Sequence, residues 1–520
     1  MSYAGETYRV PFDRGGLFYD ANIDTVPPYS MPLCRNINFH EGGRASRGGT
    51  SKINGTAVSG APRIMGLFDF QRSSASSQVF MGDDGKLYKD STTTIKTGLA
   101  TTNYPSFAVF EDELYVCEGD TTPQTWDGAA AGTSNITSPN GDWSGSTQPF
   151  QVIVHGRGVS RRLHFLMGST DYYTSLGDGK VATGGTSGTI PIDTQDSLGL
   201  TGGVEFGNRL ILFSQRQAYI VDDSDTSTAT WGYSQAQWTG GAAHWRVLVK
   251  TPNDLFIMAE DGEIYSIASV QEYGDYKRAS LTRPAKMDRW IRENIDLTKI
   301  DRFHGCYDPK LRAVRYFMVR SGQSTVDTCL KFYIDRPAEE AWAVDDGIEA
   351  ASGFDASCSA AIRASTGTYE VWTGDHVGFL WKLERTNKND ADSAYTATFK
   401  TPNMALEDPR GMKCFRRGIL TLRPEGTYDL SIKVFVDGTY KDTKTVSLAG
   451  GGAVYGTGVY DTDVYGGNDL IEADFDLGYI GRRIQFEIFN STVNQDFFVS
   501  ALLIDEKPLG KRPTADTGAG

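Results

Sequence analysis

The sequence is poor in cysteine, and the cysteines it has lie far apart. Six cysteines, at positions 34, 117, 306, 329, 358 and 414, form no C-x-x-C pair. Zinc ribbons need such close pairs, and small disulfide-stapled domains need a much higher density of cysteine. We therefore expect reduced, buried thiols that take no part in metal or disulfide chemistry.

Long apolar runs and an excess of positive charge are also missing. No run approaches the roughly 20 apolar residues that span a bilayer, and we expect no signal peptide, because the opening MSYAGETYRVPFDRGG has no apolar core. Acidic residues number 65 against 51 basic ones, for a net charge of -14. Such a chain does not grip nucleic acid by neutralising phosphates, whereas an acidic surface lets DNA slide past without sticking.

Motifs for catalysis and cofactor binding are absent as well. The sequence has no G-x-S-x-G elbow, no H-E-x-x-H, no P-loop, no dinucleotide fingerprint and no repeated Asp box. His155 and His164 could converge, but no carboxylate stands near them at metal-ligand spacing. An acidic turn at Asp222 and Asp223 has Ser227 where an EF-hand loop needs glycine. We predict that the protein is not an enzyme and holds no metal and no cofactor.

What the sequence does contain is a repeat. Seven strand-like runs each end in a polar turn and an aromatic residue, at intervals of 38, 47, 46, 46, 77 and 39 residues: Tyr88, Trp126, Tyr173, Tyr219, Tyr265, Trp342 and Trp381. A period of about 40–50 residues built from strands is typical of β-propeller blades. The predicted fold class is all-β, with a β-propeller of about seven blades, between six and eight, over residues 56–388. The longest interval holds one short inserted helix, at 283–297, and the strand that closes the propeller could come from either end of the repeats.

Different patterns flank the repeats. Residues 1–55 are rich in proline and glycine, which predicts an irregular N-terminal arm that docks on another surface. Residues 389–520 alternate apolar and polar positions, which predicts a C-terminal antiparallel β-sandwich. A glycine-rich loop within it carries Tyr455, Tyr460 and Tyr465, and it is either a contact surface or a mobile loop.

A basic cluster precedes one strand of this sandwich. It comprises Arg410, Lys413, Arg416 and Arg417. These residues could pair with carboxylates of a neighbouring subunit or protect the edge of the sandwich, and we favour the second interpretation.

The N-terminal stretch carries a family resemblance. Its successive motifs are Arg14-Gly15-Gly16-Leu17, Pro27-Pro28-Tyr29-Ser30-Met31, Arg35-Asn36-Ile37-Asn38-Phe39 and Gly43-Arg44-Ala45-Ser46-Arg47-Gly48-Gly49-Thr50. This order resembles the opening of the tail nozzle, tail hub or head-stabilisation proteins of short-tailed bacteriophages (podoviruses), and the resemblance extends over nearly the whole chain.

The resemblance implies a structural virion protein with a β-propeller and added β domains. Six copies would form a ring below the portal and adaptor proteins, a conduit and gate through which the genome is ejected, in contact with tail fibres, spikes or a needle. Genomic DNA would pass without sequence-specific binding, and there would be no small-molecule substrate. The protein would be made in the host cytoplasm and reside in the virion tail, with no family catalytic residues to transfer.

Candidate interaction residues follow from these patterns. We select three groups: the arm, with Pro27, Pro28, Tyr29, Arg35, Arg44 and Arg47; the basic cluster; and the tyrosine loop. Two other functions stay open. A receptor-binding or fibre-associated propeller of the virion would expose aromatic loops around Trp143 or Tyr172, and a propeller glycosidase would need two carboxylates about 5–9.5 Å apart in a cleft.

Overall fold

The computed structural model describes most of the chain. The described residues are 6–20, 26–73, 75–90, 93–136, 142–145, 147–156, 161–195, 197–225, 227–270, 275–346, 356–406, 408–449 and 470–509. Tyr455, Tyr460 and Tyr465 lie outside them.

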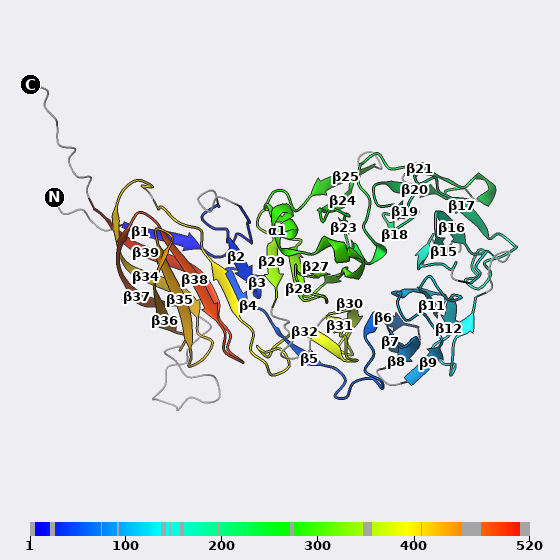
Figure 1. Ribbon diagram of the computed structural model, residues 1–520, viewed down its shortest axis with the longest axis horizontal. Helices are drawn as coiled ribbons and strands as arrows, with labels where there is room; N and C mark the ends of the chain where they lie inside the picture. The colour runs from blue at the N-terminus through cyan, green and yellow to red at the C-terminus, as the bar shows by residue number, and fades with distance from the viewer. Residues whose placement is uncertain are drawn as a thin grey trace, which may run out of the picture.

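Six four-stranded antiparallel sheets, together with four antiparallel strands of a nine-stranded sheet, form the seven blades of a β-propeller. Each innermost strand contacts the innermost strand of the next blade, and β30 contacts β6, so the ring is closed. Figure 1 shows the blades arranged around an axis. The prediction of a propeller with seven blades is confirmed.

The first four blades each come from one continuous stretch of chain. Their strands, from the inside outwards, are β6 (Ile64–Gln71), β7 (Ser76–Gly82), β8 (Lys86–Lys89) and β9 (Thr93–Thr97); β10 (Ser106–Phe110), β11 (Glu113–Cys117), β12 (Gln124–Trp126) and β13 (Ser134–Asn135); β14 (Gln151–His155), β15 (Arg162–Met167), β16 (Thr170–Tyr173) and β17 (Gly188–Pro191); and β18 (Gly202–Phe206), β19 (Arg209–Phe213), β20 (Ala218–Asp222) and β21 (Gly232–Gln235).

The last three blades include the insertion and the closure. Their strands are β22 (Leu248–Lys250), β23 (Asp254–Met258), β24 (Ile264–Val270) and β25 (Asp275–Ser280); β26 (His304–Asp308), β27 (Ala313–Met318), β28 (Thr328–Tyr333) and β29 (Trp342–Asp345); and β30 (Cys358–Arg363), β31 (Tyr369–Gly374), β32 (Leu380–Arg385) and β5 (Gly49–Lys52). The helical segments between strands are α1 (Met287–Asn294), η3 (Thr228–Thr230), η4 (Trp245–Val247) and η5 (Leu297–Arg302). The helix predicted at 283–297 is therefore present, but shorter.

The repeated aromatic residues lie between the blades. All seven are buried, and six of them stand on the third strand of their blade, whereas Trp342 stands on the fourth strand, β29. The apolar clusters that contain them join neighbouring blades, as where Trp126 packs near Phe70. The period in the sequence therefore reflects one packing position that is reused in six of the seven blades.

Residues 1–55 do not form an irregular arm. Their described part supplies β1 (Glu6–Pro11), β2 (Leu33–Arg35), β3 (Ile37–His40), β4 (Gly43–Ser46) and β5. β5 pairs with β32 and completes blade seven, so an N-terminal strand closes the propeller against C-terminal ones. These strands have three to six residues, too few to show a clear period among the prolines and glycines.

The β-sandwich is built from both ends of the chain. Its C-terminal strands are β33 (Ala397–Lys400), β34 (Lys413–Arg423), β35 (Asp429–Val436), β36 (Thr439–Ser447), β37 (Ile471–Gly481), β38 (Ile484–Asn490) and β39 (Phe498–Pro508). One sheet has the order β3-β4-β39-β34-β37, with β1 beside β39, and the other has β2-β33-β38-β35-β36. β2 also pairs in parallel with β29, so the second sheet continues blade six, and Figure 1 shows the sandwich beside the propeller.

Candidate functional site

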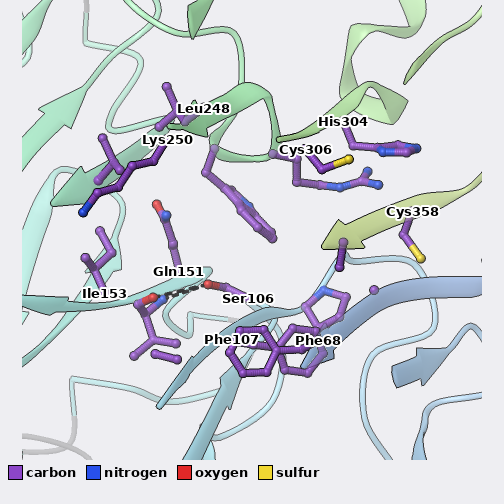
Figure 2. A pocket seen from close by; sticks show the side chains of 18 of the residues that line it. Phe68, Ser106, Phe107, Gln151, Ile153, Leu248, Lys250, His304, Cys306 and Cys358 are labelled. Atoms are coloured by element: carbon purple, nitrogen blue, oxygen red, sulfur yellow. Dashed lines mark hydrogen bonds between the residues drawn. The ribbon is translucent and has the colours of Figure 1, made fainter. Parts of the chain in front are cut away.

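The axial cavity of the propeller has a volume of about 590 Å³ and is lined by the inner strands of all seven blades. Phe68 and Phe107 stack within it, with ring centroids 5.4 Å apart (Figure 2). The Gln151 amide donates to the carbonyl oxygen of Gly203 at 2.8 Å and accepts from its N–H at 2.7 Å. Cross-blade contacts of this kind fix the wall of a cavity that is large enough for a small molecule.

Arg246 bridges three blades at the end of the cavity where the inner strands begin. It leaves η4 before blade five, donates to the Ser357 carbonyl oxygen before blade seven at 2.8 Å, and stacks 3.5 Å from the Tyr104 ring centroid before blade two. Burial lowers the pKa of this arginine. Because these blades lie on different sides of the axis, the side chain spans it. The axis of a single propeller is therefore no passage for a DNA duplex.

Burial shifts the pKa of two thiols and one imidazole that line the cavity. Burial raises the thiol pKa of both Cys306 and Cys358 to about 12, so both thiols stay protonated. His304 lies 2.8 Å from Ser359 Oγ through Nδ1 and 3.0 Å from the Ala356 carbonyl oxygen through Nε2, and burial holds its pKa well below the usual value. Ser359 therefore has an imidazole beside it, but the low pKa of His304 makes that imidazole a weak base for activating the serine hydroxyl.

A second cluster joins blades three and four. His155 Nε2 lies 3.1 Å from an oxygen of Asp223, and His164 Nδ1 lies 2.8 Å from one of Asp171. The two imidazole centroids are 5.8 Å apart. The histidines thus converge as considered, but the expected lack of nearby carboxylates is wrong, because β16 and the turn after β20 supply them.

This cluster borders a polar pocket of about 650 Å³ that also contains Glu205 and Asp222. Each of the pocket's three carboxylates is engaged: Glu205 with Lys250, Asp222 with Ser224 Oγ at 2.8 Å, and Asp223 with His155. Among the described residues, no group of three or more His, Cys, Asp or Glu side chains is placed to hold a metal ion.

Arg44 and Arg47 of the N-terminal motifs are inside the protein. Arg47 binds Asp390 in a bidentate ion pair, with 2.5 Å between Nη2 and Oδ2, and both side chains are buried. Arg44 is 1% exposed and donates to the carbonyl oxygens of Arg14 and Tyr29, each at 2.8 Å, and burial lowers its pKa to about 9. Arg44 and Arg47 are therefore not available to dock another protein, contrary to our expectation.

The same junction contains a larger buried ion network. Arg315 pairs with Asp308 at 2.9 Å, Asp345 at 3.2 Å and Glu384 at 2.7 Å, and Lys331 pairs with Asp345 at 2.8 Å. Outside the network, Arg35 is 39% exposed and pairs with Asp346 at 2.5 Å. Blades six and seven and the sandwich are thus held together by complementary charges from distant parts of the chain.

Two motif glycines are required by close backbone contact. Gly15 has a φ of 84°, and a Cβ there would lie 1.9 Å from the Tyr29 carbonyl oxygen. A Cβ at Gly49 would lie 2.0 Å from the Asn389 carbonyl oxygen. The motifs that carry the family resemblance therefore encode the connection between the propeller and the sandwich.

The remaining predicted site residues divide into internal and exposed ones. Lys413 is buried and donates to the carbonyl oxygen of Ala405 at 2.6 Å, so it is not a contact residue. Arg417 pairs with Asp474 at 3.0 Å and Asp505 at 3.2 Å within the sandwich. Because β34 lies between β39 and β37, the cluster does not protect an edge strand, contrary to the interpretation we favoured. Pro28, Arg410, Arg416 and Arg417 are exposed, and Pro27, Tyr29 and Arg35 are half-buried.

The aromatics considered for receptor binding are core residues. Trp143 is 5% exposed and Tyr172 is 8% exposed. Their rings pack edge to face, with centroids 6.0 Å apart, in the cluster between blades two and three. Neither side chain offers a platform for a host glycan.

Comparisons with known proteins concern the fold. No family model and no curated protein matches the chain. Among solved structures, YCF48 bound to D1 peptide is 10% identical with a TM-score of 0.39, covering 65% of this chain and 97% of that one. U3-55K is 8% identical with a TM-score of 0.40, covering 65% and 98%. The extracellular domain of a hybrid two-component system from B. thetaiotaomicron is 9% identical with a TM-score of 0.42, covering 76% and 49%. At such low identity the likeness concerns the β-propeller alone, and among the described residues no helix is long and apolar enough to cross a membrane.

Proposed function

We propose that this chain is the subunit of a tail nozzle or hub of a short-tailed bacteriophage. In this proposal six copies form a ring below the portal and adaptor proteins, and the genome leaves through the lumen of the ring. The protein acts as a structural conduit and gate without catalytic chemistry, and it contacts fibres, spikes or a needle at its outer surface.

The observation that carries the proposal is the location of the resembling motifs. They supply Arg44 and Arg47 to the junction, together with the two glycines in close backbone contact. A motif that encodes the joint between a propeller and a sandwich is evidence for that architecture. The short motifs and the three-dimensional arrangement therefore support the same family.

The closed axis specifies where the conduit would run. Arg246 and its partners obstruct the centre of each propeller, so a lumen for DNA has to be enclosed between copies. The net charge of -14 suits a wall that repels phosphates. The proposal thus assigns the propeller to a rigid part of the ring wall.

The receptor-binding alternative loses its specific support. A receptor binder was expected to expose Trp143 or Tyr172, and both are buried. A glycosidase needs two carboxylates about 5–9.5 Å apart in a cleft; the three in the polar pocket interact with Lys250, Ser224 and His155, and the glycosidase stays an alternative.

A nonsense mutation in the gene, within the phage that encodes it, tests the proposal. We expect heads that package DNA but lack the lower tail in negative-stain images, and we expect the wild-type chain supplied in trans to restore tails and infectivity. Particles that keep a complete, ejecting tail without this chain would contradict the proposal.

A further inference from the structure

An apolar patch lies at the end of the sandwich where β34 and β39 meet the edge strand β37. Cys414 on β34 lies opposite Lys507 on β39 and Ile480 on β37. Met412 lies two residues before Cys414, and its carbonyl oxygen accepts from the Leu509 N–H at 2.8 Å. Because residues paired across strands share a face, these side chains form one surface, which we call the sandwich tip.

The tip exposes large apolar side chains in contiguous positions. Met412 is 40% exposed, Ile480 58% and Leu509 38%, and Cys414 is half-buried beside them. Single exposed apolar residues are ordinary on a protein surface, but adjacent ones with a polar rim mark interaction sites.

Exposed basic side chains lie around this apolar patch, and Asp408 and Asp476 are exposed in the same segments. The exposed basic residues are Arg410, Arg416, Arg482 and Lys507. Within the described part of the chain none of these four side chains forms an ion pair. In a chain of net charge -14, such a cluster is complementary to the rest of the molecule.

The complementary surface is on the far side of the propeller. Turns that follow the inner or third strands of blades two to four present five acidic residues with exposed side chains, which we call the acidic turns: Glu111, Asp112, Asp127, Asp178 and Asp222. In these antiparallel blades the inner and third strands run in the same direction, so their ends share one face. Figure 1 places these blades at the opposite end of the long axis from the sandwich.

We propose that the sandwich tip of one copy docks on the acidic turns of the next copy. This contact joins two different surfaces, so repeated copies follow one another head to tail and close into a ring when the rotation allows it. The inference rests on the proposed function, because it identifies the surfaces that hold the ring together. The apolar patch supplies buried area, and the charges select the partner surface.

Charge reversal tests this contact with a matched control. The tip variant combines Arg410→Glu, Arg416→Glu and Lys507→Glu, and the control variant combines Arg216→Glu, Arg363→Glu and Lys286→Glu, which are exposed residues away from both surfaces. Both variants change the net charge equally. Mass by light scattering is measured for wild type and variants at several protein and salt concentrations, alone and with the portal-complex proteins.

We expect wild type and control to assemble, with assembly weakening as salt rises. The tip variant is expected to need at least a tenfold higher concentration. Adding Glu111→Lys and Asp222→Lys to the tip variant restores assembly, since the charges then complement each other again. Cys414 should react with maleimide in monomers and be protected in the assembled wild type.

The outcomes separate this inference from the proposed function. If the tip variant assembles like the control, with Cys414 equally reactive in monomer and ring, the docking surfaces are wrong and the ring remains. If wild type forms no ring, alone or with the portal complex, both the inference and the proposed function are overturned.

Discussion

Replacing Asp390 by asparagine should destabilise the protein far more than breaking an ion pair at the surface. Arg47 and Asp390 have side chains 4% and 3% exposed, and they make two hydrogen bonds in fork geometry, at 2.5 and 3.0 Å. Burial acts to lower the pKa of Arg47, but the charge and hydrogen bonds of Asp390 raise it above its usual value. The Asp390→Asn variant leaves a buried guanidinium without its counter-ion.

Removing one partner of a buried ion pair costs about 3–5 kcal/mol. Arg47 keeps hydrogen bonds to Asn36 and to the Gly48 carbonyl oxygen, each at 2.9 Å, so we expect a loss of about 3 kcal/mol in the free energy of unfolding. The exposed Arg417, 46% accessible and paired with Asp474 and Asp505, provides the control. Arg417→Gln should cost about 0–1 kcal/mol.

Urea unfolding followed by tryptophan fluorescence measures both losses, because Trp342 and Trp381 lie in the same core cluster as the sandwich. The double variant Arg47→Met, Asp390→Leu should recover part of the loss, since it removes both buried charges. A loss of less than about 1 kcal/mol for Asp390→Asn would refute the argument that this ion pair holds the junction together.

Three further predictions concern pH, thiols and backbone contact. Burial alone would raise the pKa of Glu384, but Arg315 and Lys331 hold it well below the usual range. The ionised carboxylate therefore stabilises the fold at neutral pH, and this stabilisation is lost as pH falls below about 4.5. Glu384→Gln should lower the stability at pH 7, and acid unfolding curves of the variant should show a flatter decline in stability. Five cysteines are buried, and burial raises the pKa of four of them to about 12. The native monomer should therefore show one titratable thiol, the Cys414→Ser variant none, and the wild type unfolded in urea six. Several fast-reacting thiols in the native monomer would contradict this. Gly49→Ala should cost about 1–3 kcal/mol because of its contact with the Asn389 carbonyl oxygen, whereas Gly55→Ala, with open space around it, should be neutral in the same denaturation assay.

The propeller could be predicted because its packing repeats. One buried aromatic position recurs in six of the seven blades, and the sequence shows it as a period. Trp342 stands on the fourth strand of its blade and not on the third. The inserted helix and loop before that blade lengthen the interval, and Trp342 still adds one aromatic residue for the blade. A repeat in the sequence predicts that blades exist, but it predicts less reliably on which strand of a blade each aromatic residue stands.

The role of the N-terminal segment could not be predicted because it depends on distant partners. Arg47 and Asp390 are 343 positions apart, and β5 is recognisable as a strand only beside β32. The four residues of β5 carry no period of their own. Patterns within residues 1–55 alone therefore predicted an irregular arm, whereas in the fold this segment supplies strands to both the propeller and the sandwich.

Site residues were harder to predict than the fold for the same reason. Exposed arginines and buried ones look alike in the sequence, so Arg44 and Arg47 were expected at a docking surface. The tip was indicated only in part, by Arg410 and Arg416, because Ile480 and Lys507 reach it through strand pairing. The convergence of His155 with Asp223 likewise depends on the contact between neighbouring blades.

The measurement that tests the central claim most directly is the mass and shape of the assembled protein, by light scattering and negative-stain imaging, alone and with portal-complex proteins. Six chains of 56.9 kDa give about 340 kDa, and the account predicts a closed ring of that mass with an open lumen between the propellers. A persistent monomer, or a compact particle without a central opening, would contradict it.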